Sequence, residues 1–276
     1  MSKSDFLYIS DFFLSDVVGG GELNDHELCN ALDCHKIYSN RVTVEFLKRI
    51  PPTKIIVSNF INLTRDCIDE LTHNHQYIIY EHDHKYLKNR NPAEFDSYKA
   101  PPDQLINVDF YKNAKAVFCQ SSFHEEIIKK NLDISTTCNV SGNLWSLDSL
   151  EVLKVLARKE KRDRFSILNS PTWHKNTATT AFYCDKKGFD YDLISSPDYN
   201  KFLSMLSSND KFIFLPKTPE TLSRVVVEAR MLGVKVLTNK NVGAVYEPWF
   251  AMKGEELIEF MINKRDVIPE LVKEKF

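Results

Sequence analysis

Short β-branched apolar runs alternate with longer helical or turn-rich segments along the chain, and this alternation constrains the fold more than any other sequence feature. In the first half, the runs that we expect to be strands cover residues 6–10, 54–58, 76–81 and 116–119. In the second half, they cover residues 165–168, 191–194, 211–215 and 234–238. Because ten or more residues separate most successive runs, crossover connections between parallel strands are favoured over hairpins. The sequence therefore predicts an α/β fold with parallel sheets.

A change of character near the middle of the chain suggests a domain boundary. Apolar residues with helical spacing at 149–156 lead into a charged run at 158–164, before the strand pattern resumes. A chain of 276 residues is long enough for two domains of ordinary size. We therefore expect an N-terminal α/β domain over 1–147 and a C-terminal one over 148–276. The pattern leaves open whether the last helix packs back across the domains.

Composition and charge argue against several classes of function. The chain has 36 Lys and Arg against 38 Asp and Glu, a balance that gives no general attraction to nucleic acid or an anionic membrane. Its six cysteines include no C-x-x-C pair, which favours reduced thiols over a disulfide framework. Acidic residues interrupt the apolar pieces of residues 1–18, unlike a signal peptide, and no apolar run reaches the ~18 residues of a membrane span. We expect a cytoplasmic protein with at most peripheral membrane contact.

Two glutamates stand eight positions apart around the start of a helix predicted over 224–232. Ser223 is a suitable N-cap, which places Glu220 in the preceding loop and Glu228 about one turn inside the helix. The first-turn N–H groups of such a helix form an anion site, and carboxylates accept paired hydrogen bonds from sugar hydroxyls. One interpretation is a nucleotide diphosphate that rests on these N–H groups, with Glu220 reaching one end of the ligand and Glu228 the other. The other is an ordinary surface ion pair between Arg224 and Glu228 at i,i+4.

The same stretch resembles the signature region of retaining glycosyltransferases of family four. Residues 219–229 read PETLSRVVVEA and contain the family's E-x7-E spacing. The resemblance implies the GT-B architecture, in which two Rossmann-like parallel-sheet domains face each other across a cleft that holds the active site. It also implies that Glu220 binds hydroxyls of the donor sugar and that Glu228 binds the ribose. Where the family usually has Phe-Gly before the helix, this chain has Leu222 and Ser223, so a backbone N–H contact survives but the fit to the sugar changes.

Two stretches in the first half also resemble the family. Gly20 and Gly21 lie in a glycine-rich segment after the first strand, similar to the loop that approaches the donor phosphates and sugar, and glycine permits such close approach. His82 follows the third strand, where ligand sites of α/β proteins gather, and matches the family's histidine near the reacting carbon. A competing interpretation pairs His82 with His84 as metal ligands, since i,i+2 positions share one face of a strand. No third ligand is identifiable, so we expect no metal.

The second half supplies the candidate diphosphate site. Lys175 matches a family lysine that neutralises the donor diphosphate. The arginine that usually accompanies it has no clear counterpart, and His174 or Arg224 are the available substitutes. Residues 190–192 read DYD, a form used for metal–nucleotide binding in the other large glycosyltransferase fold. Here these residues lie at the beginning of a predicted strand and not after its end, so we interpret their role as structural.

Together these patterns predict a metal-independent glycosyltransferase that needs no cofactor beyond its nucleotide-sugar donor. The resemblance implies retention of anomeric configuration, with His82 and Glu220 as the candidate catalytic residues. Lys175 and the helix start, including Ser223 and Arg224, would stabilise the departing nucleoside diphosphate. The acceptor, whether glycan, lipid-linked or protein, is left open, and no nucleic-acid partner is expected. Two alternatives are a non-catalytic nucleotide-sugar or glycan-binding module on the same fold and a nucleotide-sugar epimerase.

Overall fold

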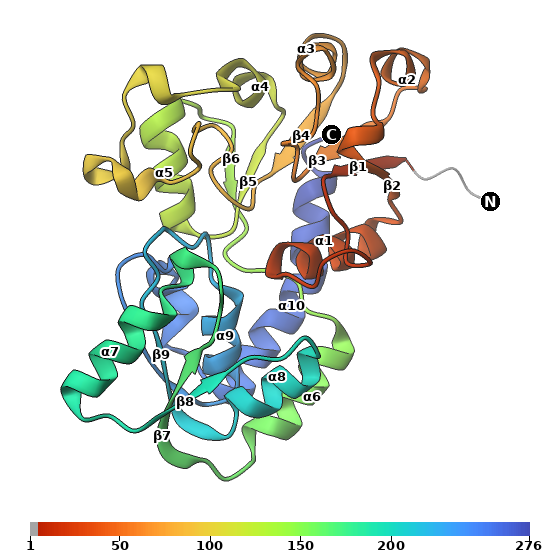
Figure 1. The fold of residues 1–276 in the computed structure, drawn as a ribbon. Helices are drawn as coiled ribbons and strands as arrows, with labels where there is room; N and C mark the ends of the chain where they lie inside the picture. The colour runs from red at the N-terminus through yellow and green to blue at the C-terminus, as the bar shows by residue number, and fades with distance from the viewer. Residues whose placement is uncertain (1–4) are drawn as a thin grey trace. The chain divides into compact units, whose positions relative to one another are not determined.

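The computed structural model describes residues 5–276, so the first four residues of the N-terminal segment discussed above lie outside the described residues. The chain divides into two compact units, each with its own parallel sheet (Figure 1). The second unit covers Trp145–Lys264, and Arg265–Phe276 joins the residues up to Leu144 in the first. Within residues 5–276, no helix combines the length and the apolar character that a bilayer crossing requires.

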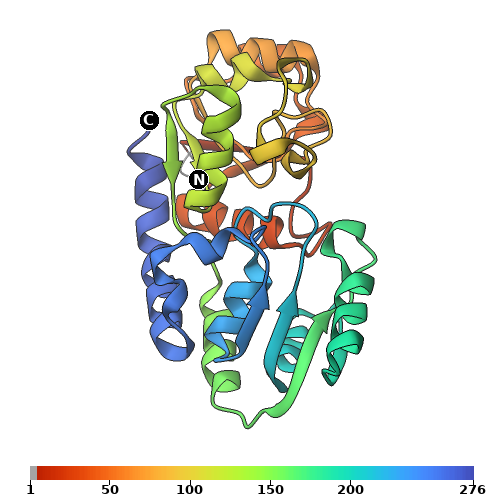
Figure 2. The ribbon, with the colours of Figure 1, turned by 90° about the vertical axis from the view of Figure 1, so that its left-hand side faces the viewer.

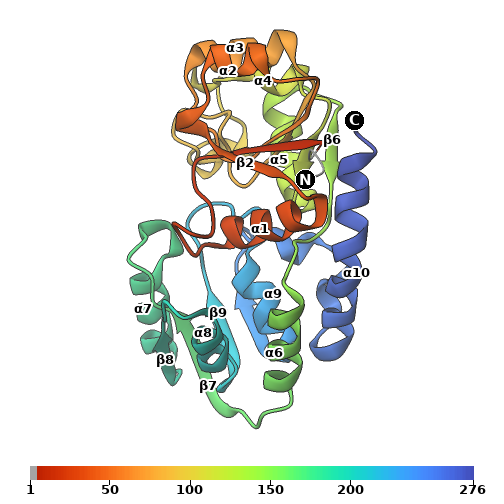
Figure 3. The same ribbon diagram turned by 90° about the vertical axis from the view of Figure 1, so that its right-hand side faces the viewer.

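The first unit is built on six parallel strands in the order β2-β1-β3-β4-β5-β6. The strands are β1 (Phe6–Ser10), β2 (His35–Tyr38), β3 (Lys54–Val57), β4 (Tyr77–Tyr80), β5 (Val117–Cys119) and β6 (Thr137–Asn139). The helices of this unit are α1 (Gly20–Leu32), α2 (Val44–Arg49), α3 (Arg65–Asn74), α4 (Val108–Asn113) and α5 (Ser122–Leu132). Figure 2 and Figure 3 show α2 and α3 on one side of the sheet and α1 on the other.

Apolar side chains cover both faces of this sheet, which explains why its central strands are continuous apolar runs in the sequence. Along β1, Leu7 and Ile9 belong to one core cluster, whereas Phe6 and Tyr8 belong to another on the opposite face. The second cluster is completed by the C-terminal segment, which contributes buried Ile268 and other apolar residues. The C-terminal segment is therefore part of the first unit's core.

The second unit is built on four parallel strands in the order β10-β9-β7-β8. The strands are β7 (Arg162–Leu168), β8 (Tyr191–Ile194), β9 (Asn209–Phe214) and β10 (Lys235–Thr238). The helices are α6 (Leu147–Ala157), α7 (Thr177–Lys187), α8 (Tyr199–Leu206), α9 (Arg224–Met231) and the first part of α10 (Gly254–Lys273). Along β9, Phe212 and Phe214 pack in the cluster with α6, α8 and α9, whereas Ile213 packs with α7 on the other face.

Two local predictions from the sequence are wrong. Helix α1 begins at Gly20, so Gly20 and Gly21 lie in its first turn and not in the expected loop, while Gly19 is the N-cap. Glycine has a low helix propensity, which is why consecutive glycines in the sequence indicated a loop. The strand expected over 165–168 is longer than predicted, because β7 begins at Arg162, within the charged run at 158–164.

Candidate functional site

His82 lies at the carboxyl end of β4 and is held through both ring nitrogens. Its Nε2 is 2.5 Å from Oδ1 of Asp25 in α1, and its Nδ1 is 2.6 Å from Nε2 of Gln120, which follows β5. Asp25 is 1% exposed, and the hydroxyl of Ser58 donates to its Oδ2 at 2.6 Å. The sequence patterns indicated His82 but not Asp25, Gln120 or Ser58.

The protonation of His82 is set by two opposing effects. Burial of the ring disfavours the imidazolium, but the adjacent Asp25 carboxylate favours it more strongly. The pKa of His82 therefore lies above its usual value of 6.5. Among the charged groups that act on this ring, the buried Asp25 carboxylate has the largest effect on its pKa.

Gly21 lies against the His82 ring. A Cβ atom at this position would stand 3.5 Å from Cγ and 3.6 Å from Nδ1 of His82, which is ordinary van der Waals contact. Both candidate glycines, Gly20 and Gly21, open α1, whose N-cap residue Gly19 offers no side chain for capping. The structure thus brings the first turn of α1 and the strand-end histidine together, as a ligand-binding role for both requires.

A buried group of charges fixes the segment that follows His82. Lys85 Nζ is 2.7 Å from Oε1 of Glu81 and 2.7 Å from Oδ1 of Asp83, and its side chain is 1% exposed. The Tyr111 hydroxyl donates to the second oxygen of Glu81. Burial disfavours the charged lysine, but its two carboxylate partners outweigh burial and raise the pKa of Lys85. This cluster ties the chain beyond β4 to α4.

His84 does not extend His82 into a metal pair. The strand ends at Tyr80, so the two histidines do not share a strand face, and Nδ1 of His84 is 2.9 Å from the Tyr86 hydroxyl. The His84 ring packs edge-to-face on His124 with centroids 5.3 Å apart. Among residues 5–276, no three His, Cys, Asp or Glu side chains are grouped so that they could hold a metal ion.

In the second unit, Lys175 and Glu220 form a two-point ion pair. Lys175 ends a short 3-10 turn after β7, and its Nζ lies 2.8 and 2.9 Å from the two carboxylate oxygens of Glu220. The Glu220 backbone is fixed on both sides, because its N–H donates to Asn241 and its C=O accepts from Gly243. The lysine side chain is 28% exposed and that of the glutamate 13%. The structure therefore places the candidate diphosphate lysine and the candidate sugar carboxylate side by side.

Glu228 lies inside the second unit and has three partners on one oxygen. Its Oε1 accepts hydrogen bonds from Trp145 Nε1 at 3.0 Å and the Tyr199 hydroxyl at 2.5 Å, and Arg224 Nε is 3.2 Å away. Burial raises the pKa of Glu228, and Arg224 partly offsets that effect. The Arg224 guanidinium also stacks on the Trp145 ring at 4.2 Å. The predicted surface pair between Arg224 and Glu228 is thus present but buried.

Ser223 is not the side-chain cap that the sequence predicted. Its φ is +73°, in the left-handed region, and its side chain makes no capping hydrogen bond. Side-chain capping requires an extended N-cap backbone, so this conformation turns the hydroxyl away from the first-turn N–H groups. The Ser223 hydroxyl is buried and has no hydrogen-bond partner within the described part of the chain. A left-handed backbone favours glycine, the residue usual here in family four.

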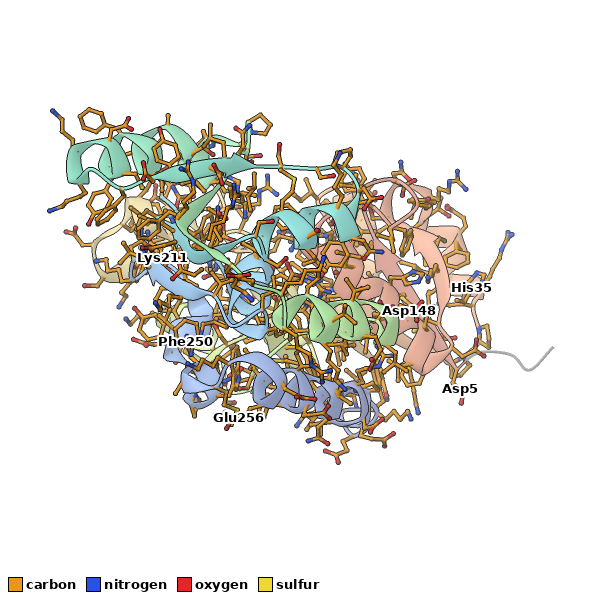
Figure 4. All side chains as sticks on the ribbon, turned by 90° about the horizontal axis from the view of Figure 1, so that it is seen from below. Asp5, His35, Asp148, Lys211, Phe250 and Glu256 are labelled. Atoms are coloured by element: carbon orange, nitrogen blue, oxygen red, sulfur yellow. The ribbon has the colours of Figure 1, made fainter. Side chains whose placement is uncertain are left out.

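Asp192 of the DYD segment connects neighbouring strands of the second sheet. Asp192 accepts hydrogen bonds from Arg162 at 2.7 Å, Arg164 at 3.0 Å and Asn209 at 3.1 Å. Lys211 of β9, labelled in Figure 4, forms a further ion pair with a neighbouring carboxylate of β7. These contacts join β7, β8 and β9 and do not involve the candidate site residues.

Comparisons with known proteins identify the architecture. No protein-family model matches the chain, and no curated protein matches it by sequence. Sucrose-phosphate synthase from Thermosynechococcus elongatus matches 98% of both chains with a TM-score of 0.63 at 9% identity. Trehalose-6-phosphate synthase OtsA matches 97% of this chain and 98% of its own with a TM-score of 0.58 at 7% identity. The chain has the GT-B fold.

A third GT-B structure was determined in complex with a nucleotide sugar. Anabaena Alr3699/HepE in complex with UDP-glucose matches 98% of this chain and 90% of its own, with a TM-score of 0.51 at 13% identity. At identities this low, the likeness establishes the GT-B fold alone. The roles of the individual side chains therefore depend on the geometry described above.

The GT-B chain should become more stable when Ser223 is replaced by glycine. A left-handed backbone costs a residue with a Cβ about 1 kcal/mol, and the unpaired buried hydroxyl adds to this cost. We expect Ser223→Gly to raise the free energy of unfolding of the second unit by about 1 kcal/mol. Urea denaturation followed by tryptophan fluorescence measures this, because all three tryptophans lie in the second unit.

The matched control is Ser204→Gly in the interior of α8. Glycine there should lower the free energy of unfolding by about 0.5 kcal/mol or more, since it weakens a regular helix. Equal effects of the two substitutions would contradict the assignment of backbone strain to Ser223.

The first unit should lose stability as the pH falls below neutrality. Burial lowers the pKa of His84 to about 4, whereas the unfolded chain protonates this residue near 6.5. Between pH 6.5 and about 4, the unfolded state therefore binds a proton at His84 that the folded state does not bind, and the free energy of unfolding falls as the pH is lowered through this range. Each pH unit in this window costs about 1.4 kcal/mol.

Urea denaturation followed by far-ultraviolet circular dichroism at pH 7 and pH 5 tests this prediction. His84→Gln should reduce the dependence of the unfolding free energy on pH, whereas His35→Gln, at an exposed position on β2, should not. An unchanged pH dependence in the His84 variant would show that the ring is not kept neutral by burial.

Proposed function

We propose that this chain is a glycosyltransferase that moves a sugar from a nucleotide-sugar donor to an acceptor with retention at the anomeric carbon. The observation that carries the proposal is the contact between Lys175 and Glu220. The bond that breaks in a nucleotide sugar joins a sugar to a phosphate, so a transfer site needs a phosphate-binding cation next to a hydroxyl-binding acceptor. Lysine and glutamate supply these two functions. Glu220 lies in the loop that leads into α9, and Lys175 contacts it there.

The chemistry proposed for this pair is electrostatic. Without donor, Glu220 neutralises Lys175. The ammonium has three N–H donors, so it can bind an oxygen of the diphosphate and keep one bond to Glu220. The carboxylate oxygen released in this way accepts from a donor-sugar hydroxyl. Lys175 and the first-turn amides of α9, including that of Arg224 after Ser223, then stabilise the negative charge that grows on the leaving nucleoside diphosphate.

The remaining site residues follow from the resemblance and fit their surroundings. Glu228 is the proposed ribose ligand, and the contacts from Trp145, Tyr199 and Arg224 all go to one oxygen of its carboxylate. A carboxylate has about four acceptor positions, so these contacts leave capacity for a ribose hydroxyl. In the first unit, His82 and the first turn of α1, with Gly20 and Gly21, are the proposed contacts of the donor sugar.

A non-catalytic module that binds nucleotide sugars is the second candidate. It is favoured by the ion pair itself, because a donor must partly open the contact between Lys175 and Glu220 before either side chain can serve it. It is also favoured by Arg224, one of the two available substitutes for the family's arginine, because this side chain is 9% exposed and engaged with Glu228. Binding without turnover distinguishes this candidate from an enzyme.

Ligand-induced stabilisation tests donor binding. UDP, GDP and ADP, each alone and as its glucose conjugate, are added to the full chain. UDP-glucose is the first choice, since HepE, of the same fold, was determined with that ligand. A ligand at a hundred times its dissociation constant stabilises the folded state by about 2.7 kcal/mol, which raises the melting temperature. We expect at least one of these ligands to give such a shift.

Lys175→Ala should weaken that binding roughly 10- to 100-fold, the range expected for loss of a charge-assisted hydrogen bond. The control is Lys187→Ala at the end of α7, which removes a lysine of equal charge that faces solvent. No stabilisation by any nucleotide would contradict the proposed function. Equal binding by the Lys175 variant would contradict the role of Lys175.

A further inference from the structure

A chain of short hydrogen bonds runs through His82 within the first unit. Ser58 donates to Asp25 at 2.6 Å, Asp25 contacts His82 Nε2 at 2.5 Å, and His82 Nδ1 contacts Gln120 Nε2 at 2.6 Å. The four residues come from four places along the chain: the end of β3, α1, the end of β4 and the end of β5. Ser58, Asp25 and Gln120 are all at most 4% exposed. The imidazole is therefore held by buried partners.

The direction of each hydrogen bond follows from Gln120. Its Nε2 also donates to the backbone C=O of Glu81 at 3.1 Å, which identifies the amide nitrogen and fixes its orientation. An N–H group from this nitrogen points at His82 Nδ1, so Nδ1 accepts. The proton of the neutral ring must then be on Nε2, where it is donated to Asp25. Asp25 and Gln120 thus select the same tautomer from opposite sides.

This tautomer makes Nδ1 the ring atom that can accept a hydrogen bond from a ligand. Gly21 of α1 lies against the ring, and a Cβ there would lie 3.6 Å from Nδ1. Because glycine has no Cβ, α1 places no side chain over this atom at that position. Gly21 and His82 thus belong to the same part of the site.

We propose that Asp25 is the positioning residue that keeps His82 in the Nε2–H tautomer, and that a sugar hydroxyl replaces Gln120 as the donor to Nδ1 when substrate binds. This inference rests on the proposed function, since it gives His82 a sugar as its ligand. Asp25 does not touch the substrate. It acts by fixing the orientation and the proton of His82.

Two other buried polar residues of the first unit, Asn24 and Asp11, have structural contacts with the backbone. Asn24, which precedes Asp25, accepts from the Leu144 backbone N–H at 2.9 Å. Asp11 is another buried carboxylate of this unit, and it accepts from the backbone N–H groups of Ile61 and Asn62 at 2.9 and 3.0 Å. Both brace the backbone. Asp25, by contrast, contacts the titratable ring of His82.

Several charged groups act on His82, and Asp25 is the strongest favourable one. Glu22 in α1 also favours the imidazolium, whereas Lys85 beyond β4 opposes it. His124 in α5 is itself kept neutral by burial and senses the charge of His82. Removal of the Asp25 charge therefore has a defined sign: the pKa of His82 falls.

Nuclear magnetic resonance of the histidine ring nitrogens in the full chain tests the inference without an activity assay. His82→Gln identifies the His82 signals by their absence. At neutral pH, the neutral ring of the wild type should carry its proton on Nε2. Asp25→Asn should lower the pKa of His82 and mix the two tautomers. Gln120→Met should raise the pKa, because it removes the N–H group that opposes protonation of Nδ1.

Asp11→Asn is the matched control, since it neutralises a buried carboxylate of the same unit that has no contact with His82. It should leave the His82 signals unchanged. Where donor turnover is measured, Asp25→Asn should reduce kcat/KM roughly tenfold or more and move the pH profile to lower pH, whereas Asp11→Asn should do neither.

Identical His82 titration and tautomer in the wild type and the Asp25 variant would overturn the inference. A shift of the same sign in the Asp25 and Gln120 variants would also overturn it. If these signals change as expected but the wild type neither binds nor turns over any nucleotide sugar, the proposed function fails, and the positioning of His82 by Asp25 stands.

Discussion

Lys175 and Glu220 are joined by two short contacts, and the topology of the second sheet brings their two loops together. Lys175 follows β7 and Glu220 follows β9, and these two strands are direct neighbours in the parallel sheet. Carboxyl ends of parallel strands meet at one edge, so the loops that leave them lie together. The backbone contacts of Glu220 with Asn241 and Gly243 add the loop after β10 to the same edge. One cation and one carboxylate thus lie together at this edge, with the carboxylate in the loop that precedes α9.

The first unit follows the same rule with different side chains. His82 and Gln120 leave the neighbouring strands β4 and β5, and Ser58 leaves β3, so their side chains meet at the carboxyl edge. Asp25 reaches this edge from α1, which follows β1. Sheet order reverses between β1 and β3, and ligands of open α/β sheets bind beside such a reversal. The buried partners of His82 therefore lie where the topology favours a binding site.

Much of the fold could be predicted from apolar patterning, because central strands of parallel sheets are buried on both faces. The strands β2 and β6 were not predicted, because they are partly exposed edge strands with no apolar run. Motif spacing singled out Glu220 as a candidate, and the family resemblance singled out Lys175 and His82. Neither could single out Asp25, which lies 57 positions from His82 and meets it only in the folded chain. The predicted cap at Ser223 was wrong because a left-handed backbone cannot be inferred from a serine in the sequence.

Release of nucleoside diphosphate from nucleotide-sugar donors is the most direct measurement of the central claim. The wild type is compared with Glu220→Gln, which preserves the shape of the side chain and removes the charge that balances Lys175. The account predicts turnover of at least one donor by the wild type, and a loss of about 100-fold in the variant, the size expected for a preorganised electrostatic contact. Donor binding with no turnover, or equal turnover by both proteins, would contradict it.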